Sequence, residues 1–162
     1  MKYNSAMNFE HLIQINDPAN PLIESLTRDQ IWQGLLHRVE NPLPFLPGLA
    51  SCTILERQAA GLLRELDFGA ATIRDRVTLA AADWVRFDIL PSAAHAGGSL
   101  TISIEEPQPD CLFLRFAYRT TLASNPNSEE QAYIEYVKSA YHQSDVDCVR
   151  LIRTLAATGD PQ

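Results

Sequence analysis

Between Ser51 and Leu122 the sequence alternates apolar and polar residues in six short segments. A period of two is that of β-strands with one buried and one solvated face. Gly, Ala, Pro and Asp separate the segments in connections too short for a crossover helix, so consecutive strands must pair antiparallel as a meander. The predicted strands are Ser51–Arg57, Leu62–Phe68, Thr72–Leu79, Trp84–Leu90, Ser99–Glu105 and Leu112–Leu122.

A strand and a helix are predicted before the meander. Phe9–Ile15 alternates in the same way and predicts a first strand. Thr27 followed by Gln30 has the pattern of a capping box, which predicts a helix start. The prolines of Asn41–Gly48 end this helix, because each lacks an amide donor and restricts the residue before it.

A long helix is predicted after the meander, over Ser128–Ala157, and Ser128 and Gln131 form a second capping box. Gln143–Asp147 is the weak part of its pattern, where the sequence is compatible with a kink. A curved antiparallel sheet with one long helix at its end can enclose a cavity, which favours a small apolar ligand. The helix face expected to cover the sheet is Ala132, Tyr133, Tyr136, Val137, Ala140, Tyr141, Cys148, Ile152 and Leu155.

Charge complementarity predicts the register of one hairpin. A two-residue turn at Gly69–Ala70 pairs Glu65 with Arg74 and Arg64 with Asp75. Both pairs are complementary, which fixes the two faces of the hairpin. The same register that turns apolar residues inward also turns Arg64 and Asp75 inward.

The next hairpin is predicted to have a three-residue turn at Ala80–Ala82. This turn aligns Val77 with Val85 and places Arg74 opposite Asp88. The inward-facing residues of the two hairpins are then Leu62, Leu66, Phe68, Ile73, Val77, Leu79, Val85, Phe87 and Ile89.

Length and composition limit the classes of protein that the chain can represent. Its 162 residues predict a single domain over 1–162, with flexible ends at 1–8 and 158–162. No stretch reaches the roughly 18 apolar residues of a membrane span, and the first ten residues lack the apolar block of a secretory signal. A net charge of −7 opposes nucleic-acid binding. We therefore expect a cytoplasmic protein; the sequence leaves open whether Met1 or Met7 is the natural start.

No motif predicts a metal or a cofactor. The cysteines at 52, 111 and 148 and the histidines at 11, 37, 95 and 142 lack the spacing of a metal site, and reduced thiols are expected. Nucleophile elbows, phosphate loops and dinucleotide fingerprints are missing from the sequence. His11 would act as acid or base only if it met Arg64 and Asp75.

The order of strand, helix, six-strand meander and long helix resembles the helix-grip fold of the START and birch-pollen-allergen superfamily, also called SRPBCC. Within it, Phe9–His11, Leu26–Trp32, Asn41–Phe45 and Leu63–Gly69 resemble the AtaL-like family of bacterial and fungal proteins. The resemblance implies an α+β helix-grip fold, in which a curved seven-stranded antiparallel sheet wraps around a long C-terminal helix, with a short helical segment after the first strand. It also implies a deep cavity, and it implies no reaction and no catalytic residues.

The inward polar and aromatic residues are the candidate ligand site. A charged pair inside a cavity is costly to desolvate, so Arg64 and Asp75 are candidates to orient a polar group of a ligand, or else a structural ion pair. Tyrosines suit a pocket because each has an apolar body and one polar tip, although core packing explains them as well. The predicted ligand-binding residues are Arg64, Asp75, Tyr118, Phe68, Phe87, Phe116, Tyr133, Tyr136 and Trp32.

We interpret the chain as a protein that binds a small, mainly apolar ligand, aromatic or polyketide-like, between sheet and long helix. One alternative is an enzyme of the polyketide cyclase or dehydratase kind, using the same inward polar residues. Another is an interaction module whose core is filled by its own side chains. A homodimer is compatible with each of these.

Overall fold

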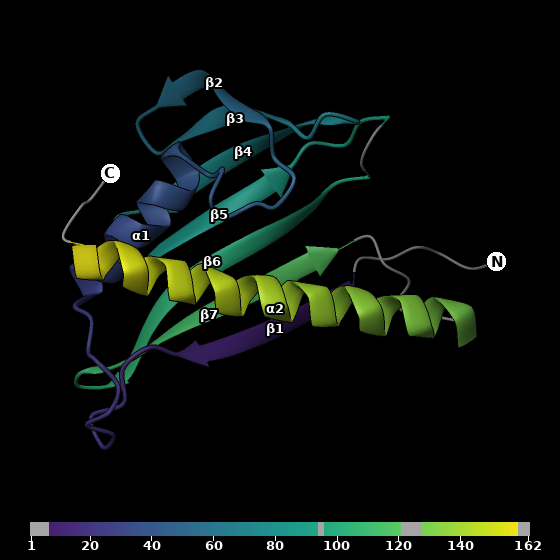
Figure 1. Ribbon diagram of the computed structural model, residues 1–162. Helices are drawn as coiled ribbons and strands as arrows, with labels where there is room; N and C mark the ends of the chain where they lie inside the picture. The colour runs from purple at the N-terminus through teal and green to yellow at the C-terminus, as the bar shows by residue number, and fades with distance from the viewer. Residues whose placement is uncertain (1–6, 94–95, 121–127, 159–162) are drawn as a thin grey trace.

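The structure, a computed structural model, describes residues 7–93, 96–120 and 128–158. Within these residues a seven-stranded antiparallel sheet has the strand order β1-β7-β6-β5-β4-β3-β2, and two helices pack on it (Figure 1). The strands are β1 Met7–Gln14, β2 Ser51–Gln58, β3 Gly61–Asp67, β4 Thr72–Ala80, β5 Trp84–Ile89, β6 Gly98–Gln108 and β7 Cys111–Thr120; the helices are α1 Arg28–Glu40 and α2 Ser128–Thr158. Every predicted element is present, with ends that differ by a few residues.

The short helix α1 begins and ends where local chemistry dictates. The Thr27 hydroxyl accepts from the Gln30 N–H at 3.0 Å, and the Gln30 side chain accepts from the Thr27 N–H at 2.8 Å, which confirms the capping box. The helix ends at Asn41, whose N–H donates to the His37 carbonyl immediately before Pro42. Buried Asn16 fastens the loop before the helix, because its side chain bonds both the N–H and the carbonyl of Leu26.

The long helix α2 crosses the sheet and runs without interruption through the weak segment Gln143–Asp147. Its C-terminal half is packed, with Cys148 and Ile152 in the core. Its N-terminal half is packed less: Ile134 is 2% exposed, but Tyr133 and Tyr136 are 60% and 71% exposed, because this end projects beyond the strands (Figure 1). The predicted helix face is wrong at the exposed Ala132, Tyr136 and Ala140. The side chain of Ser128, and with it the second capping box, lies outside the described residues.

The predicted register is confirmed for the first hairpin: β3 pairs with β4 so that Arg64 is opposite Asp75 and Glu65 is opposite Arg74. For the second hairpin the prediction is wrong by two residues. Val77 is opposite Phe87 and Arg76 is opposite Asp88.

The turn explains this shift. β4 continues to Ala80, which pairs with Trp84, and the three-residue turn lies one position later than predicted. Ala82 adopts a positive φ of 59°, and the Asp83 N–H donates to the Ala80 carbonyl at 3.0 Å. A shift of two residues leaves each side chain on its face of the sheet, so the predicted inward set stands.

The core lies between the sheet, α1 and the C-terminal half of α2. Ile31 and Leu35 of α1, Ile102 and Leu114 of the sheet and Ile152 of α2 have at most 1% of their surface exposed. Neither described helix combines the length and the apolar character needed to cross a membrane.

Candidate functional site

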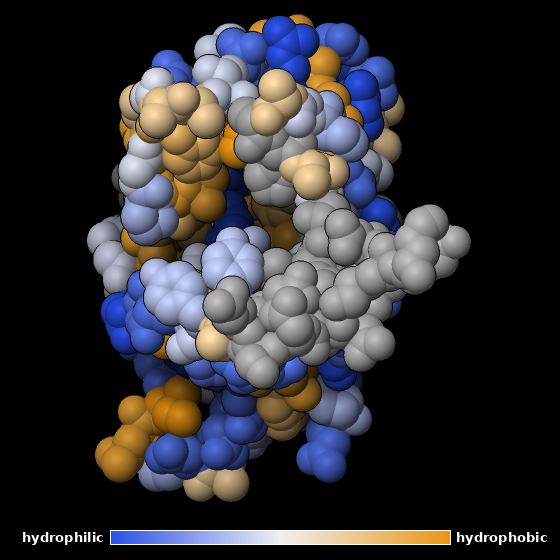
Figure 2. All heavy atoms as spheres, turned by 90° about the vertical axis from the view of Figure 1, so that its right-hand side faces the viewer, coloured by the Kyte–Doolittle hydropathy of each residue, from blue (hydrophilic) through white to orange (hydrophobic). Residues whose placement is uncertain are grey.

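A cavity of about 430 Å³ lies between the sheet and the N-terminal half of α2. Figure 2 shows a hollow on this side of the molecule, with hydrophobic residues on its sides and hydrophilic atoms at its floor. The apolar wall is formed by residues of β3, β4, β5 and β6 and by Phe68 directly after β3: Leu66, Phe68, Ile73, Phe87, Ile89 and Leu100. Four of the polar residues that line it are Arg38, Arg64, Asp75 and Tyr118.

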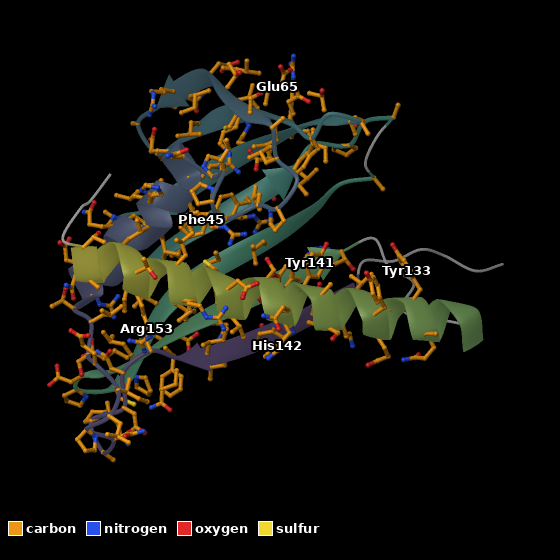
Figure 3. The ribbon with its side chains drawn as sticks, viewed as in Figure 1. Phe45, Glu65, Tyr133, Tyr141, His142 and Arg153 are labelled. Carbon is orange, nitrogen blue, oxygen red and sulfur yellow. The ribbon has the colours of Figure 1, made fainter. Side chains whose placement is uncertain are left out.

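The cavity brings together six of the nine predicted ligand-binding residues: Arg64, Asp75, Tyr118, Phe68, Phe87 and Tyr133. Three others lie elsewhere. Phe116 and Trp32 are buried in the core, and Tyr136 is exposed on α2. Tyr141, one helical turn from Val137, lines the cavity beside Tyr133, and in Figure 3 both tyrosines extend from one edge of α2 while His142 extends from the other.

Arg64 and Asp75 form a buried bidentate ion pair. Arg64 Nε donates to Asp75 Oδ1 at 2.9 Å and Nη2 donates to Oδ2 at 2.5 Å. Arg64 Nη1 donates to the carbonyls of Arg38 and Val39 at 3.2 and 3.0 Å. These carbonyls belong to the last turn of α1, where a positive charge is favoured. The pair therefore ties α1 to the sheet, and most of its hydrogen-bonding capacity is used within the protein.

Arg38 has a different environment, although it lines the same cavity. Only 7% of it is exposed, and its Nη1 has no hydrogen-bond partner in the part of the chain that the structure describes. Its guanidinium carbon lies 5.9 Å from the centre of the Phe45 ring and 5.5 Å from that of Phe87. Burial opposes its charged form, but nearby groups, Cys148 first among them, raise the pKa of Arg38 above its ordinary value. The cavity floor thus holds a permanent positive charge with an unused donor.

Asp145 is fully buried and joins the cavity wall to the other side of α2. The Tyr118 hydroxyl donates to Asp145 Oδ1, and His11 Nδ1 lies 2.7 Å from Asp145 Oδ2. Burial raises the pKa of Asp145, and the two hydrogen bonds partly offset this. Burial and the Asp145 charge raise the pKa of Tyr118, so its hydroxyl stays protonated. His11 accordingly meets Asp145 and Tyr118, not the Arg64–Asp75 pair.

Aromatic rings hold this chain of polar groups in place. The rings of Phe9, Tyr118 and Tyr141 form a triangle: the Tyr118 centre lies 5.1 Å from that of Phe9 and 4.5 Å from that of Tyr141, and the latter two are 6.0 Å apart. The ring of His142 meets that of His11 edge-on at 4.8 Å. β1, β7 and α2 together therefore fix the direction of the Tyr118 hydroxyl.

The sequence analysis did not identify Arg38 or Asp145, yet both carry a signal. Arg38 is three residues after Leu35 and seven after Ile31, which places it on the buried stripe of α1. Asp145 is three residues before Cys148 and seven before Ile152, on the buried stripe of α2. A charged residue on such a stripe indicates either a polar partner or a site.

Among the described residues no group of three or more His, Cys, Asp and Glu side chains could hold a metal ion. The three cysteines are free; Cys148 is buried, and Cys52 and Cys111 are half-buried. Burial raises the pKa of the Cys148 thiol, which disfavours the thiolate. The buried polar groups at the cavity are Arg38, the Arg64–Asp75 pair and the Tyr118–Asp145–His11 chain, and the lining also includes Ser99, Arg119, Thr120, Tyr133, Tyr141 and Ser144.

Comparison with known proteins relates this geometry to a family. A family model described as acetylaranotin biosynthesis cluster protein L matches residues 13–159. No curated protein matches the sequence.

Several solved structures share the fold at low identity. The Zhui aromatase/cyclase from Streptomyces sp. R1128 superposes with a TM-score of 0.67 at 15% identity, over 96% of this chain and 99% of that one. The di-domain aromatase/cyclase StfQ from the steffimycin biosynthetic pathway gives 0.68 at 14% identity; the match covers 96% of this chain, which spans only 52% of StfQ. Ara h 8.0201 gives 0.61 at 12% identity, over 92% of this chain and 99% of that one. At these identities the likeness shows the helix-grip fold.

Proposed function

The chain belongs to the AtaL family of helix-grip proteins, and on that premise we propose that it binds a small, mainly apolar ligand, aromatic or polyketide-like, in the cavity beneath α2. The observation that carries the proposal is the cavity itself. Its volume of about 430 Å³ is within the range of about 300–1,000 Å³ usual for small-molecule sites. An apolar wall with a few converging polar groups is also the usual composition of such sites.

The two kinds of lining residue have separate roles in this proposal. Phe68 and Phe87 contact the flat body of the ligand, and Tyr133 closes over it from α2. Tyr118 and the Arg64–Asp75 pair meet its polar end. Because the pair is already bonded within the protein, it acts as a rigid polar surface and contributes little charge of its own.

The proposal is tested with 2-naphthamide, a neutral aromatic probe, by isothermal titration calorimetry. Ile73→Trp fills the cavity from β4, whereas Thr72→Trp adds the same ring on the opposite, exposed face of that strand. We expect saturable binding to the wild type and to Thr72→Trp, and at least tenfold weaker binding to Ile73→Trp. Equal binding to both tryptophan variants, or the absence of saturable binding of both 2-naphthamide and its acid, 2-naphthoate, to the wild type, would contradict the proposal.

A second candidate function is a cyclase or dehydratase activity, and the Tyr118–Asp145–His11 chain favours it. Loss of water from a β-hydroxy ketone moves a proton from carbon to a base and gives another to the departing hydroxyl, so two ionisable groups must act at one point. In this candidate Asp75, which lines the cavity, takes the proton from carbon, and Tyr118 gives its proton to the departing hydroxyl, which leaves as water. Asp145 and His11 lie behind Tyr118 and return a proton to it. Aromatase/cyclases among the structural neighbours give this candidate support at the level of fold.

This second candidate is tested with 4-hydroxy-4-(2-naphthyl)butan-2-one, whose dehydration produces a conjugated enone that absorbs in the near ultraviolet. Under the enzyme hypothesis the wild type accelerates enone formation, and Tyr118→Phe loses at least a hundredfold while it still binds 2-naphthamide. Equal rates with the wild type and Tyr118→Phe would leave ligand binding as the function.

A further inference from the structure

Three arginines line the cavity, the exposed Arg119 and the buried Arg38 and Arg64, and of the two buried ones only Arg64 has its donors matched. Arg64 donates to both oxygens of Asp75 and to two carbonyls of α1. Arg38 forms no ion pair with any described carboxylate, and its Nη1 bonds to nothing that the structure describes. Within the same cavity, therefore, the donors of Arg64 have acceptors in the protein, whereas Nη1 of Arg38 has none among the described residues.

Asp145 is a buried carboxylate whose charge acts on Arg38, but both of its oxygens already have other partners. It accepts from the Tyr118 hydroxyl and contacts His11 Nδ1 at 2.7 Å. The Arg64–Asp75 pair is neutral as a unit. Arg38 is therefore a buried positive charge, which an arginine cannot lose by deprotonation, and it meets the Asp145 carboxylate only through space, because both oxygens of Asp145 are engaged elsewhere.

A buried charged donor without an acceptor is unfavourable, and more so than a neutral one. The flanking rings of Phe45 and Phe87 favour the cation through their π faces, but they offer no acceptor in the plane of the guanidinium. Arg38 therefore lacks an acceptor oxygen, and an anionic oxygen would form the strongest hydrogen bond with it.

We propose that Arg38 is the anchor of the cavity and that the ligand carries a carboxylate on an aromatic or polyketide-like body. The inference rests on the proposed ligand-binding function and adds the chemical class of the ligand's polar end. The carboxylate accepts from the Arg38 guanidinium at the floor, while the body lies along the apolar wall between Phe87 and Tyr133. A carboxylate accepts a charge-assisted hydrogen bond from the guanidinium, which is stronger than the bond that a neutral carbonyl or a water molecule accepts.

The test compares two probes of the same shape, 2-naphthoate and its neutral amide, 2-naphthamide, by titration calorimetry at pH 7.5. We expect the wild type to bind the carboxylate at least tenfold more tightly than the amide, a difference of about 1.4 kcal/mol. Arg38→Met keeps the length of the side chain and removes the charge, so the ratio of the two affinities falls to about one. Arg74→Met, which removes an exposed arginine of β4 outside the cavity, keeps the wild-type ratio.

Arg38→Lys tests whether the arrangement of the donors matters, because it keeps the positive charge but loses the planar fork of donors. It is expected to retain only part of the preference for 2-naphthoate over 2-naphthamide. The wild-type ratio needs no variant, so the test stands even if Arg38→Met does not fold. A wild-type ratio near one, or a preference that survives in folded Arg38→Met, overturns the inference and leaves the proposed function intact. Failure of both probes to bind the wild type overturns the proposed function as well.

Discussion

At the scale of single residues, Asp145 shows how the fold changes the chemistry of a side chain. It is a carboxylate with no exposed surface on the buried stripe of a helix. Burial raises its pKa above the ordinary value of 3.8, and the partners Tyr118 and His11 only partly compensate. Such perturbed carboxyls gather at functional sites, which agrees with the place of Asp145 behind the cavity wall.

This shift predicts a pH dependence of stability. Because the folded state binds the Asp145 proton more tightly than the unfolded state does, the stabilisation is complete below about pH 3.8 and is lost as the pH rises through the folded pKa. We expect the free energy of unfolding of the wild type, relative to Asp145→Asn, to fall from about pH 4 upward. Urea denaturation of both proteins over a pH series measures this. Asp147→Asn, an exposed position two residues away, is the control, and a wild-type difference from Asp145→Asn that is independent of pH would refute the assignment.

The residues of the site differed in how far the sequence could reveal them. Arg64 and Asp75 could be placed because their partners face each other across one hairpin, where charge and register constrain each other. Asp145 could not, because its partner His11 is 134 residues away and the contact exists only once α2 crosses β1 and β7. Arg38 has no partner for its Nη1 among the residues that the structure describes, so no pairing rule could find it.

At the scale of elements, the crossing of α1 and α2 depends on a single glycine. A Cβ at Gly34 would lie 2.7 Å from Cγ1 and 2.8 Å from Cγ2 of Ile152, closer than side chains pack. The absence of a side chain therefore allows the helices to approach and buries Ile152.

Gly34→Ala is predicted to destabilise the fold despite the better helix propensity of alanine, by about 1–3 kcal/mol. In an Ile152→Ala background the two nearest atoms are gone and only the Cβ of residue 152, 3.1 Å away, remains, so the same change is expected to cost less, from about 0 to 1 kcal/mol. Chemical denaturation of the four proteins forms a double-mutant cycle. An equal cost of Gly34→Ala in both backgrounds would exclude the steric explanation.

The Arg64–Asp75 pair connects α1 to β3 and β4, and its loss has a defined energetic signature. Arg64→Met leaves a buried carboxylate unpaired and two α1 carbonyls without their donor, which predicts a loss of about 3–5 kcal/mol. Arg64→Met combined with Asp75→Leu removes both charges and is expected to recover part of this loss. Arg74→Met breaks the exposed pair with Glu65 and serves as control, with an expected cost of about 0–1 kcal/mol. A double variant less stable than Arg64→Met would show that the pair is not the source of the effect.

The strands, the helices and the face of each strand were predictable, because each depends on local periodicity and turn chemistry. The register of β4 and β5 was not, because arginines occupy both 74 and 76. Either arginine gives a complementary pair with Asp88, and both registers keep the same residues inward. Only the conformation at Ala82, with its positive φ, separates them, and an alanine there has no sequence signal for it.

At the scale of the whole molecule, the architecture divides α2 into a packed half and an overhanging half. Cys148, Val149 and Ile152 bury the C-terminal half against the core. In the N-terminal half Tyr133 and Tyr141 line the cavity while much of their surface remains exposed. One helix thus supplies both the stable base of the fold and the wall over the cavity.

This division predicts an uneven pattern of amide hydrogen exchange along α2. Segments with little burial open at lower free energy than the core, so amides of residues 132–141 are expected to exchange faster than those of 148–156. A ligand beneath the helix contacts Tyr133, Val137 and Tyr141, so 2-naphthamide at a hundred times its dissociation constant is expected to slow exchange first in 132–141. The same concentration stabilises the whole fold by about 2.7 kcal/mol through mass action, measurable as a higher urea midpoint. Ile73→Trp, with the cavity filled, gives the reference pattern without ligand effects. Protection confined to 148–156, or the same protection in Ile73→Trp, would place the ligand somewhere other than beneath the overhanging half of α2.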